Sequence, residues 1–372
     1  MPRLLTPHPS AAQSLRSGAS DPAVLAAAQQ LARGSLVGLP TETVYGLAAD
    51  AGQPAAVQRI FTAKGRPADH PLIVHLPPDW APGVAHHTGA TEGAPSTVPD
   101  FAWRLMHAFW PGPLTLILPR RSGVAEAAAG GQTSIGLRCP AHPVAQAVLQ
   151  AAQALGVKGV AAPSANRFGR VSPTTAAHVS SEFADLDDDS LLVLDGGACE
   201  VGIESTIIDA TRGSPVLLRP GMVSVAALEA VCGCAVLGPS EARLATPAPK
   251  ASGTLASHYA PNATVRLMDA DSLQTALIQL VGAMGANASG QPVLAVYAHQ
   301  RPQGVTPLQA DSAPNGRIVW HAMPDDAAAC AHELFAVLRQ FDATGVPLIW
   351  VELPPADAAW DGVRDRLQRA AA

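Results

Sequence analysis

Residues 21–40 read DPAVLAAAQQLARGSLVGLP, and this stretch sets the pattern of the chain. Asp21 suits the N-cap of a helix, Pro22 suits its first position, and Gly34 suits its end. The apolar run SLVGLP after the glycine predicts a short strand. A helix that leads directly into a strand is the repeating element of an α/β sheet.

The same alternation continues beyond this stretch. Helical patterns such as AAVQRIFTAK (55–64), FAWRLMHAF (101–109) and HPVAQAVLQAAQAL (142–155) separate short apolar runs. The predicted strands are PLIVHL (71–76), TLILP (115–119), SIGLR (134–138), KGVAA (158–162), LLVL (191–194), STIID (205–209) and PVLLR (215–219).

A change of composition near Gly238 divides the chain. The stretch GPSEARLATPAPKASGTLASHYAP (238–261) is rich in Pro, Ala, Ser and Gly, has no apolar period, and indicates a linker. After it, strand-like and helix-like runs alternate again, which predicts a smaller Rossmann-like α/β domain. We therefore expect a flexible leader at 1–20, a first domain at 21–223, a partly ordered region with a linker or lid at 224–260, and a second domain at 261–372.

Charge and motifs exclude several classes of protein. The 372 residues carry 24 Lys and Arg against 30 Asp and Glu, a net charge of −6, which argues against a general nucleic-acid binder. Five Cys form no CxxC pair, and no long uncharged apolar run or secretory signal is present, so we expect a cytoplasmic protein without a membrane segment. The P-loop, GxGxxG, HExxH and GxSxG motifs are also absent. We interpret the pair His86-His87 as a solvated loop feature rather than a metal site.

Polar side chains follow several predicted strands. Thr41, Glu42, Thr43 and Tyr45 come directly after the strand at 35–40, where they could bind a small polar ligand or simply form a capped turn. The loop APSANRFGRVSPTT offers Ser164, Asn166, Ser172 and Thr174 for phosphate or ribose contacts, and Ser172 also suits the N-cap of a helix near Pro173.

Four cations suggest an anion site. Lys64 and Arg66 lie two residues apart at the end of a predicted helix, where they could instead be solvent-facing charges. Arg138 and Arg219 each end a predicted strand, where α/β folds place ligands. Together the four could neutralise a triphosphate, because charge-assisted hydrogen bonds are the strong ones.

In order, the blocks PTETVYG, KGRPADHPLIVH, WPGPLTLIL, SIGLRCP, APSANRFGRVSPT and GIESTIID with LLRPG resemble the YrdC-like family of L-threonylcarbamoyl-AMP synthases. The resemblance runs from about Ala23 to Val223, and the later GTLASHYAP with its α/β tail is similar to the long form of the enzyme. It implies a twisted, mixed α/β sheet with a concave, positively charged face.

The resemblance also implies an activity. L-threonine, bicarbonate (or CO2) and ATP, with Mg2+, would give threonylcarbamoyl-AMP and pyrophosphate, and a separate transferase complex would pass the threonylcarbamoyl group to tRNA beside the anticodon. A weak RNA contact is a further expectation.

The family's site residues carry over by position. The threonine portion is expected at Thr43, His75, Arg138, Ala162 and Ser205. The nucleotide is expected at Arg66, His70, Ser134, Ser164, Asn166, Ser172 and Arg219, with Lys64 and Arg66 as the catalytic cations and Tyr259 as a linker residue that closes over the nucleotide. His70 stands where Asn is common, and the linker is less basic than in many members.

Two other functions compete with this interpretation. A double-stranded RNA-binding module could use the same basic surface, but the net charge argues against it. Carbamoyl transfer in hydrogenase maturation uses similar domains, but the zinc-binding Cys pairs expected beside them are absent.

Overall fold

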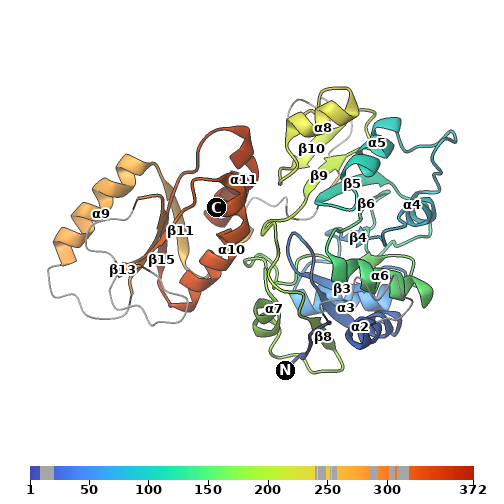
Figure 1. Cartoon of the computed structure of the whole chain (residues 1–372), viewed down its shortest axis with the longest axis horizontal. Coiled ribbons are helices and arrows are strands. Elements are labelled where there is room, and N and C mark those ends of the chain that lie inside the picture. The colour runs from blue at the N-terminus through green and yellow to red at the C-terminus, as the bar shows by residue number, and fades with distance from the viewer. Residues whose placement is uncertain are drawn as a thin grey trace. The chain divides into compact units, whose positions relative to one another are not determined.

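The computed structural model describes residues 1–8, 21–238, 241, 249–251, 253, 258–284, 292–300, 306–307 and 318–372 (Figure 1). The chain forms two compact units. The first contains Met1–Phe168 and Ser172–Thr254, and the second contains Gly169–Val171 and Leu255–Ala372. Much of the predicted leader (residues 9–20) and much of the predicted linker lie outside the described residues.

Within the described residues, the first unit is built on a ten-stranded sheet in the order β1-β8-β2-β3-β7-β4-β6-β5-β9-β10. Parallel pairs such as β4·β6 and β5·β9 occur beside antiparallel pairs such as β5·β6 and β2·β3, so the predicted mixed sheet is confirmed. The strands are β1 (Arg3–Leu5), β2 (Leu36–Leu39), β3 (Gly46–Asp50), β4 (Ile73–His75), β5 (Leu114–Pro119), β6 (Ser134–Arg138), β7 (Val160–Ala161), β8 (Leu191–Leu194), β9 (Thr206–Asp209) and β10 (Val216–Arg219).

The helices of this unit begin and end at recognisable residues. Asp21 caps α2 as predicted, because its Oδ1 accepts a hydrogen bond of 2.8 Å from the main-chain N–H of Ala23. Gly65 ends α3 in the left-handed conformation. The helices are α2 (Pro22–Ala32), α3 (Pro54–Lys64), α4 (Ala81–Thr88), α5 (Asp100–Phe109), α6 (Pro143–Ala154), α7 (Ala176–Glu182) and α8 (Val225–Cys232).

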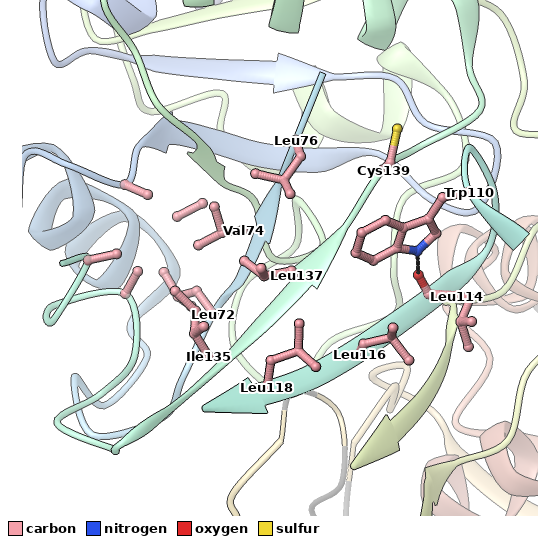
Figure 2. Packing of buried hydrophobic residues seen from close by; sticks show 14 of the residues in the cluster. Leu72, Val74, Leu76, Trp110, Leu114, Leu116, Leu118, Ile135, Leu137 and Cys139 are labelled. Carbon is pink, nitrogen blue, oxygen red and sulfur yellow. Dashed lines mark hydrogen bonds between the residues drawn. The ribbon is translucent and has the colours of Figure 1, made fainter. Parts of the chain in front are cut away.

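Alternation along the strands divides the sheet into two faces. In β4, β5 and β6 every second residue points into the main core, which α3 and α5 also line; Figure 2 shows this layer. There the indole N–H of Trp110 donates to the carbonyl of Leu114 at 2.7 Å. The core residues of these strands are Val74, Leu114, Leu116, Leu118, Ile135 and Leu137.

The opposite face changes character along the sheet. Over β8, β2 and β3 it packs against α2 and α6 in a second apolar cluster. Over β4, β6, β5 and β9 it carries a small group of isoleucines, Ile73, Ile117 and Ile207, with polar residues between and beyond them. This part of the face holds most of the strand residues that the sequence analysis singled out.

Two local predictions were wrong, and one strand was not predicted. His86 and His87 lie in the last turn of α4 and not in a loop, because the imidazole of the buried His87 donates to the Gly83 carbonyl one turn earlier, at 2.8 Å. The cap of α7 is Thr175 and not Ser172, since the Thr175 hydroxyl accepts from the N–H of His178. No apolar period predicted β1, which pairs in parallel with β8.

The second unit contains a parallel sheet in the order β11-β15-β12-β14-β13, which confirms the predicted Rossmann-like layer. Its elements are β11 (Thr264–Met268), α9 (Ala270–Met284), β12 (Leu294–Ala298), β13 (Thr306–Pro307), β14 (Ile318–Ala322), α10 (Ala327–Ala343), β15 (Leu348–Glu352), a 3-10 turn η1 (Ala358–Trp360) and α11 (Asp361–Ala370). In the described part of the chain, no helix is long and apolar enough to cross a membrane.

Candidate functional site

Sheet pairing brings several of the predicted site residues together. His75 at the end of β4 and Arg138 at the end of β6 are partners in the parallel register. Ser134 lies at the other end of β6, and because side chains alternate, it shares a face with Arg138. All three side chains are buried. The end of each strand therefore delivers a polar group to the same face.

The Arg138 guanidinium has three partners inside the protein. One terminal nitrogen donates to the Thr43 hydroxyl at 2.8 Å, the other to a Glu42 carboxylate oxygen at 2.5 Å, and Nε donates to the Gly112 carbonyl at 3.2 Å. Arg138 and Glu42 form an ion pair in which each side chain is about 5% exposed. We call Glu42, Thr43, His75 and Arg138 the Arg138 cluster.

His75 is electrically neutral in this cluster. Burial, helped by the positive charge of Arg138, lowers the pKa of His75 to about 3. Within the described residues its Nδ1 has no hydrogen-bond partner, although the side chain is almost fully buried. Such an atom is placed to bind a polar ligand, because leaving it unpaired costs free energy.

Ala162 and Ser164 follow β7 at the edge of the same region. The N–H of Ala162 donates to the Ile73 carbonyl at 3.0 Å, which fixes the chain beside β4. Gly46 pairs with Ser164, and a Cβ at Gly46 would lie 3.0 Å from the Ala162 side chain. Glycine at position 46 therefore lets these two segments approach closely.

Lys64 is buried at the end of α3 rather than directed to solvent. Its ammonium group donates to the main-chain carbonyls of Ser164, at 2.7 Å, and of Asn166. Burial first, and then the charge of Arg66, hold the pKa of Lys64 well below its usual range, while Glu204 opposes this effect. The alternative interpretation of Lys64 as a solvent-facing helix-end charge was wrong.

Arg66 follows the left-handed Gly65 and is 7% exposed. It donates to the Pro71 carbonyl at 2.9 Å, and its guanidinium lies 5.9 Å from the centre of the Phe168 ring. His70 contacts the same ring edge-on at 5.5 Å. Phe168 thus lies against both predicted nucleotide residues.

A buried carboxylate connects this group to the next strand. The Ser172 hydroxyl donates to a carboxylate oxygen of Glu204 at 2.5 Å, and both side chains are buried. The charge of Glu204 also acts on Lys64. We call Lys64, Arg66, Ser164, Asn166, Ser172 and Glu204 the Lys64 cluster.

Ser205, next to Glu204 in the chain, connects the Lys64 cluster to the sheet. Its hydroxyl hydrogen-bonds that of Thr115 on β5 at 2.8 Å, and its carbonyl accepts from Arg219 at 2.9 and 3.1 Å. A Cβ at Gly221 would lie 2.6 Å from the Thr206 nitrogen and 2.9 Å from the Glu204 carbonyl. The turn after Arg219 therefore packs directly on the segment 204–206.

Two family models match the chain. The Sua5/YciO/YrdC model, described as "Telomere recombination", covers residues 29–221, and the model "Threonylcarbamoyl-AMP synthase, C-terminal domain" covers 223–372.

Similar proteins match over nearly their full length. The threonylcarbamoyl-AMP synthase of Pyrococcus abyssi is 35% identical over 92% of both chains, and that of Bacillus subtilis is 34% identical over 95% of this chain and 94% of its own. This chain belongs to the threonylcarbamoyl-AMP synthase family. The solved structure of P. abyssi Sua5 complexed with L-threonine is 34% identical over 94% of each chain, with a TM-score of 0.76.

Two residues of the predicted linker pack within the first unit. Gln132 exchanges two hydrogen bonds with the main chain of Lys250, at 2.8 and 3.2 Å, and the Lys250 ammonium pairs with Asp69 at 2.6 Å. Ala251 packs against the isoleucines of the sheet face. A small cavity lined by Ser134, Gly136, Lys250 and Ala251, among others, lies beneath.

Tyr259, the predicted linker residue of the synthase site, belongs to the second unit. There its ring lies 5.4 Å from that of Phe335 and 5.4 Å from the Arg366 guanidinium, and its φ of 64° is in the left-handed region. Its contact with a nucleotide stays a prediction.

Sequence reasoning did not single out three residues that contact the predicted site residues. Glu204 and Thr115 lie inside the matched blocks GIESTIID and WPGPLTLIL, and Phe168 inside APSANRFGRVSPT, yet none has a spacing that marks it. Thr115 could have been found from the alternation of side chains along β5. It lies two residues before Ile117 and therefore points to the same face of the sheet.

The chemistry available to a metal is limited. Across the described ranges, no group of three or more His, Cys, Asp or Glu side chains is arranged to hold an ion. One carboxylate among the predicted phosphate residues is Glu204, which already accepts from Ser172. The described residues thus present cations, hydroxyls and amides to the predicted phosphates.

Proposed function

We propose that the chain condenses L-threonine, bicarbonate or CO2, and ATP into L-threonylcarbamoyl-AMP and releases pyrophosphate. The observation that best supports this proposal is the pair of neighbouring residues Glu204 and Ser205. It connects a cluster of buried cations with a sheet face that presents Arg138 and a neutral His75, in a chain that matches the synthases along both domains.

On the threonine side, we assign Thr43, His75, Arg138, Ala162 and Ser205 to the amino acid. Three of the five N–H groups of Arg138 are used inside the protein, so one remains on each terminal nitrogen for the threonine carboxylate. His75 Nδ1 can bond its polar groups, and the hydroxyls of Thr43 and Ser205, although already bonded to Arg138 and Thr115, each keep one further hydrogen-bonding position.

On the nucleotide side, we assign the phosphates to Lys64, Arg66 and Arg219. The hydroxyls and amide of the loop add polar contacts, and His70 lies against Phe168 at the edge of the group. Residues proposed to contact the nucleotide through polar atoms are His70, Ser134, Ser164, Asn166, Ser172 and Tyr259.

The chemistry needs little proton transfer from the protein. The threonine amine adds to CO2 and loses a proton, which gives the carbamate N-carboxythreonine. A carbamate oxygen then attacks the α-phosphorus of ATP, the new P–O bond forms, and the bond to the leaving pyrophosphate breaks. Lys64, Arg66 and Arg219 stabilise the charge that accumulates on the phosphate oxygens. Positioning and charge stabilisation are therefore the main contributions of the residues in the site.

Mg2+ enters this proposal with the nucleotide, as MgATP, and would neutralise part of the triphosphate charge. The residues present fit a metal carried by the substrate, because the described site offers hydroxyl and amide oxygens around the predicted phosphates and no three-ligand cluster.

Water exclusion supports the proposal, because N-carboxythreonine is short-lived in water. Lys250 and Ala251 lie over the sheet face near Ser134, where a linker segment can limit solvent access. We propose that Tyr259 contributes to the same closure, and that the product passes to a tRNA-modifying threonylcarbamoyl transferase complex.

The test is product analysis by mass spectrometry. The full chain incubated with threonine, bicarbonate and MgATP should yield threonylcarbamoyl-AMP, and reactions that lack threonine or bicarbonate should not. Folded protein that forms no such product would disprove the proposal.

A further inference from the structure

We propose that Glu42 is a positioning residue for threonine binding, which acts through Arg138. The inference rests on the proposed function. Glu42 lies in the loop between β2 and β3, and its carboxylate is 95% buried. It does not need to touch the substrate for this role.

Both oxygens of the Glu42 carboxylate are engaged. Oε1 accepts from Arg138 at 2.5 Å, and Oε2 accepts from the main-chain N–H of Ala141 at 3.0 Å. The carboxylate therefore binds the end of β6 at two points, one on a side chain and one on the backbone. This fixes the guanidinium plane relative to the strand, while Thr43 fixes its other terminal nitrogen.

The backbone of the loop that contains Glu42 is also held by hydrogen bonds, from residues 201–202. The Glu42 carbonyl accepts from Val201 at 2.7 Å, and the Thr43 carbonyl accepts from Gly202 at 3.1 Å. Residues 201–202 lead directly to Ser205. Glu42 thus connects three segments that each supply a proposed threonine contact, namely Thr43, Arg138 and Ser205.

The negative charge of Glu42 has a second effect, which acts on the charge of Arg138. The titratable groups whose interactions reach this pair are neutral near pH 7: burial lowers the pKa of His75 and His142, and burial raises the pKa of the Cys139 and Cys199 thiols. Glu42 therefore cancels the charge of Arg138 locally. Recognition of a carboxylate then depends on the directions of the two remaining N–H groups, which Glu42 sets.

The experiment measures the KM values for threonine and ATP in Glu42→Gln, followed as pyrophosphate release. Glutamine keeps the size and one acceptor oxygen but removes the charge. We expect the KM for threonine to rise tenfold or more, about 1.4 kcal/mol, with the KM for ATP within twofold. The matched control is Glu92→Gln, an exposed carboxylate paired with His107, which should change neither value.

A double-mutant cycle separates positioning from general stability. In an Arg138→Lys background, Glu42→Gln should add little, since its effect passes through the guanidinium. An unchanged KM for threonine, equal rises in both KM values, or full additivity with Arg138→Lys would overturn the proposal. If Glu42→Gln does not fold, Glu42→Asp must show the same threonine-specific rise.

Calorimetry keeps this inference distinct from the proposed function. A wild-type chain that binds threonine but makes no adenylate would disprove the function alone. Weaker threonine binding by Glu42→Gln would still support the positioning role, and equal binding would refute it.

Discussion

The Arg138 cluster and the Lys64 cluster hold buried cations in different ways. Arg138 lies 2.5 Å from a buried carboxylate that cancels its charge. Lys64 instead donates to two main-chain carbonyls, and no carboxylate of the described residues lies within ion-pair distance of it.

The difference corresponds to the two proposed ligands. A carbonyl oxygen orients an ammonium group without cancelling its charge, so Lys64, when protonated, offers that charge to the strongly anionic triphosphate. An ion-paired guanidinium offers direction instead, which is enough for a single carboxylate. The cost of the first arrangement is the depressed pKa of Lys64.

The largest effect on adenylate formation is expected from removing a positive charge from the Lys64 cluster. We expect Lys64→Ala and Arg66→Ala each to reduce adenylate formation by roughly one to three orders of magnitude, since charge-assisted contacts are worth about 1.5–3 kcal/mol and more in a transition state. Lys158→Ala, which removes an exposed lysine, is the control. Normal turnover in folded Lys64 and Arg66 variants would show that these charges do not serve the reaction.

Amino-acid analogues probe the Arg138 cluster. Threonine should be preferred over 2-aminobutyrate, which lacks only the hydroxyl, by roughly 10- to 100-fold, because a buried polar partner left unpaired costs about 1–3 kcal/mol. Threonine should also be preferred over serine, which lacks only the methyl group, but by a smaller factor. Competition followed as pyrophosphate release measures both ratios. Equal use of 2-aminobutyrate and threonine would mean that Thr43 and Ser205 do not read the hydroxyl.

The pH dependence of the reaction tests at which pH Lys64 loses its proton. Lys64 must be protonated to bind phosphate, so kcat/KM for ATP should fall as pH rises through a pKa below the usual lysine value. Glu182 and Glu204 both raise that pKa, whereas Arg66 and Arg167 lower it. Glu182→Gln and Glu204→Gln should therefore both shift the fall to lower pH.

The two carboxylates should differ in a second measurement. Glu204→Gln should also raise the KM for ATP severalfold, because its carboxylate orients Ser172. Glu182→Gln should not, since its carboxylate accepts from the Arg167 main chain instead. The same KM in both variants would contradict the role of Glu204.

A separate prediction concerns the free energy of unfolding and belongs to His75. Its pKa is about 3 in the folded state and near 6.5 when unfolded, so the unfolded chain takes up a proton that the folded chain does not. The free energy of unfolding should therefore decrease as pH falls from about 6.5 towards 3. His75→Gln should flatten this decrease when the free energy of unfolding is measured by chemical denaturation at several pH values.

Much of the first unit was predictable because local rules and tertiary structure agree. Asp21, Pro22 and Gly34 bound α2 as expected, and both Arg138 and Arg219 end strands. The strands at 71–76 and 134–138 appear where short apolar runs predicted them.

The partners of the cations were not predictable, because they come from distant segments. Glu42 meets Arg138 across 96 residues, and Lys64 finds its carbonyl partners 100 and 102 residues later. The helix α4 escaped prediction for a similar reason: its Pro, Gly and His residues suggest a loop, but Val84 is fully buried in the main core. Pairings set by tertiary packing leave no periodic trace in the sequence.

The alternation of β6 also limits how this protein can change in length. Five residues, SIGLR, place Ser134 and Arg138 on the face of the site and Ile135 and Leu137 in the core. Inserting or deleting one residue within the strand would exchange these roles, burying an arginine in the apolar layer and turning leucine towards the ligand. Natural variation in β6 should therefore consist of substitutions, with gains and losses of residues confined to the loops on either side.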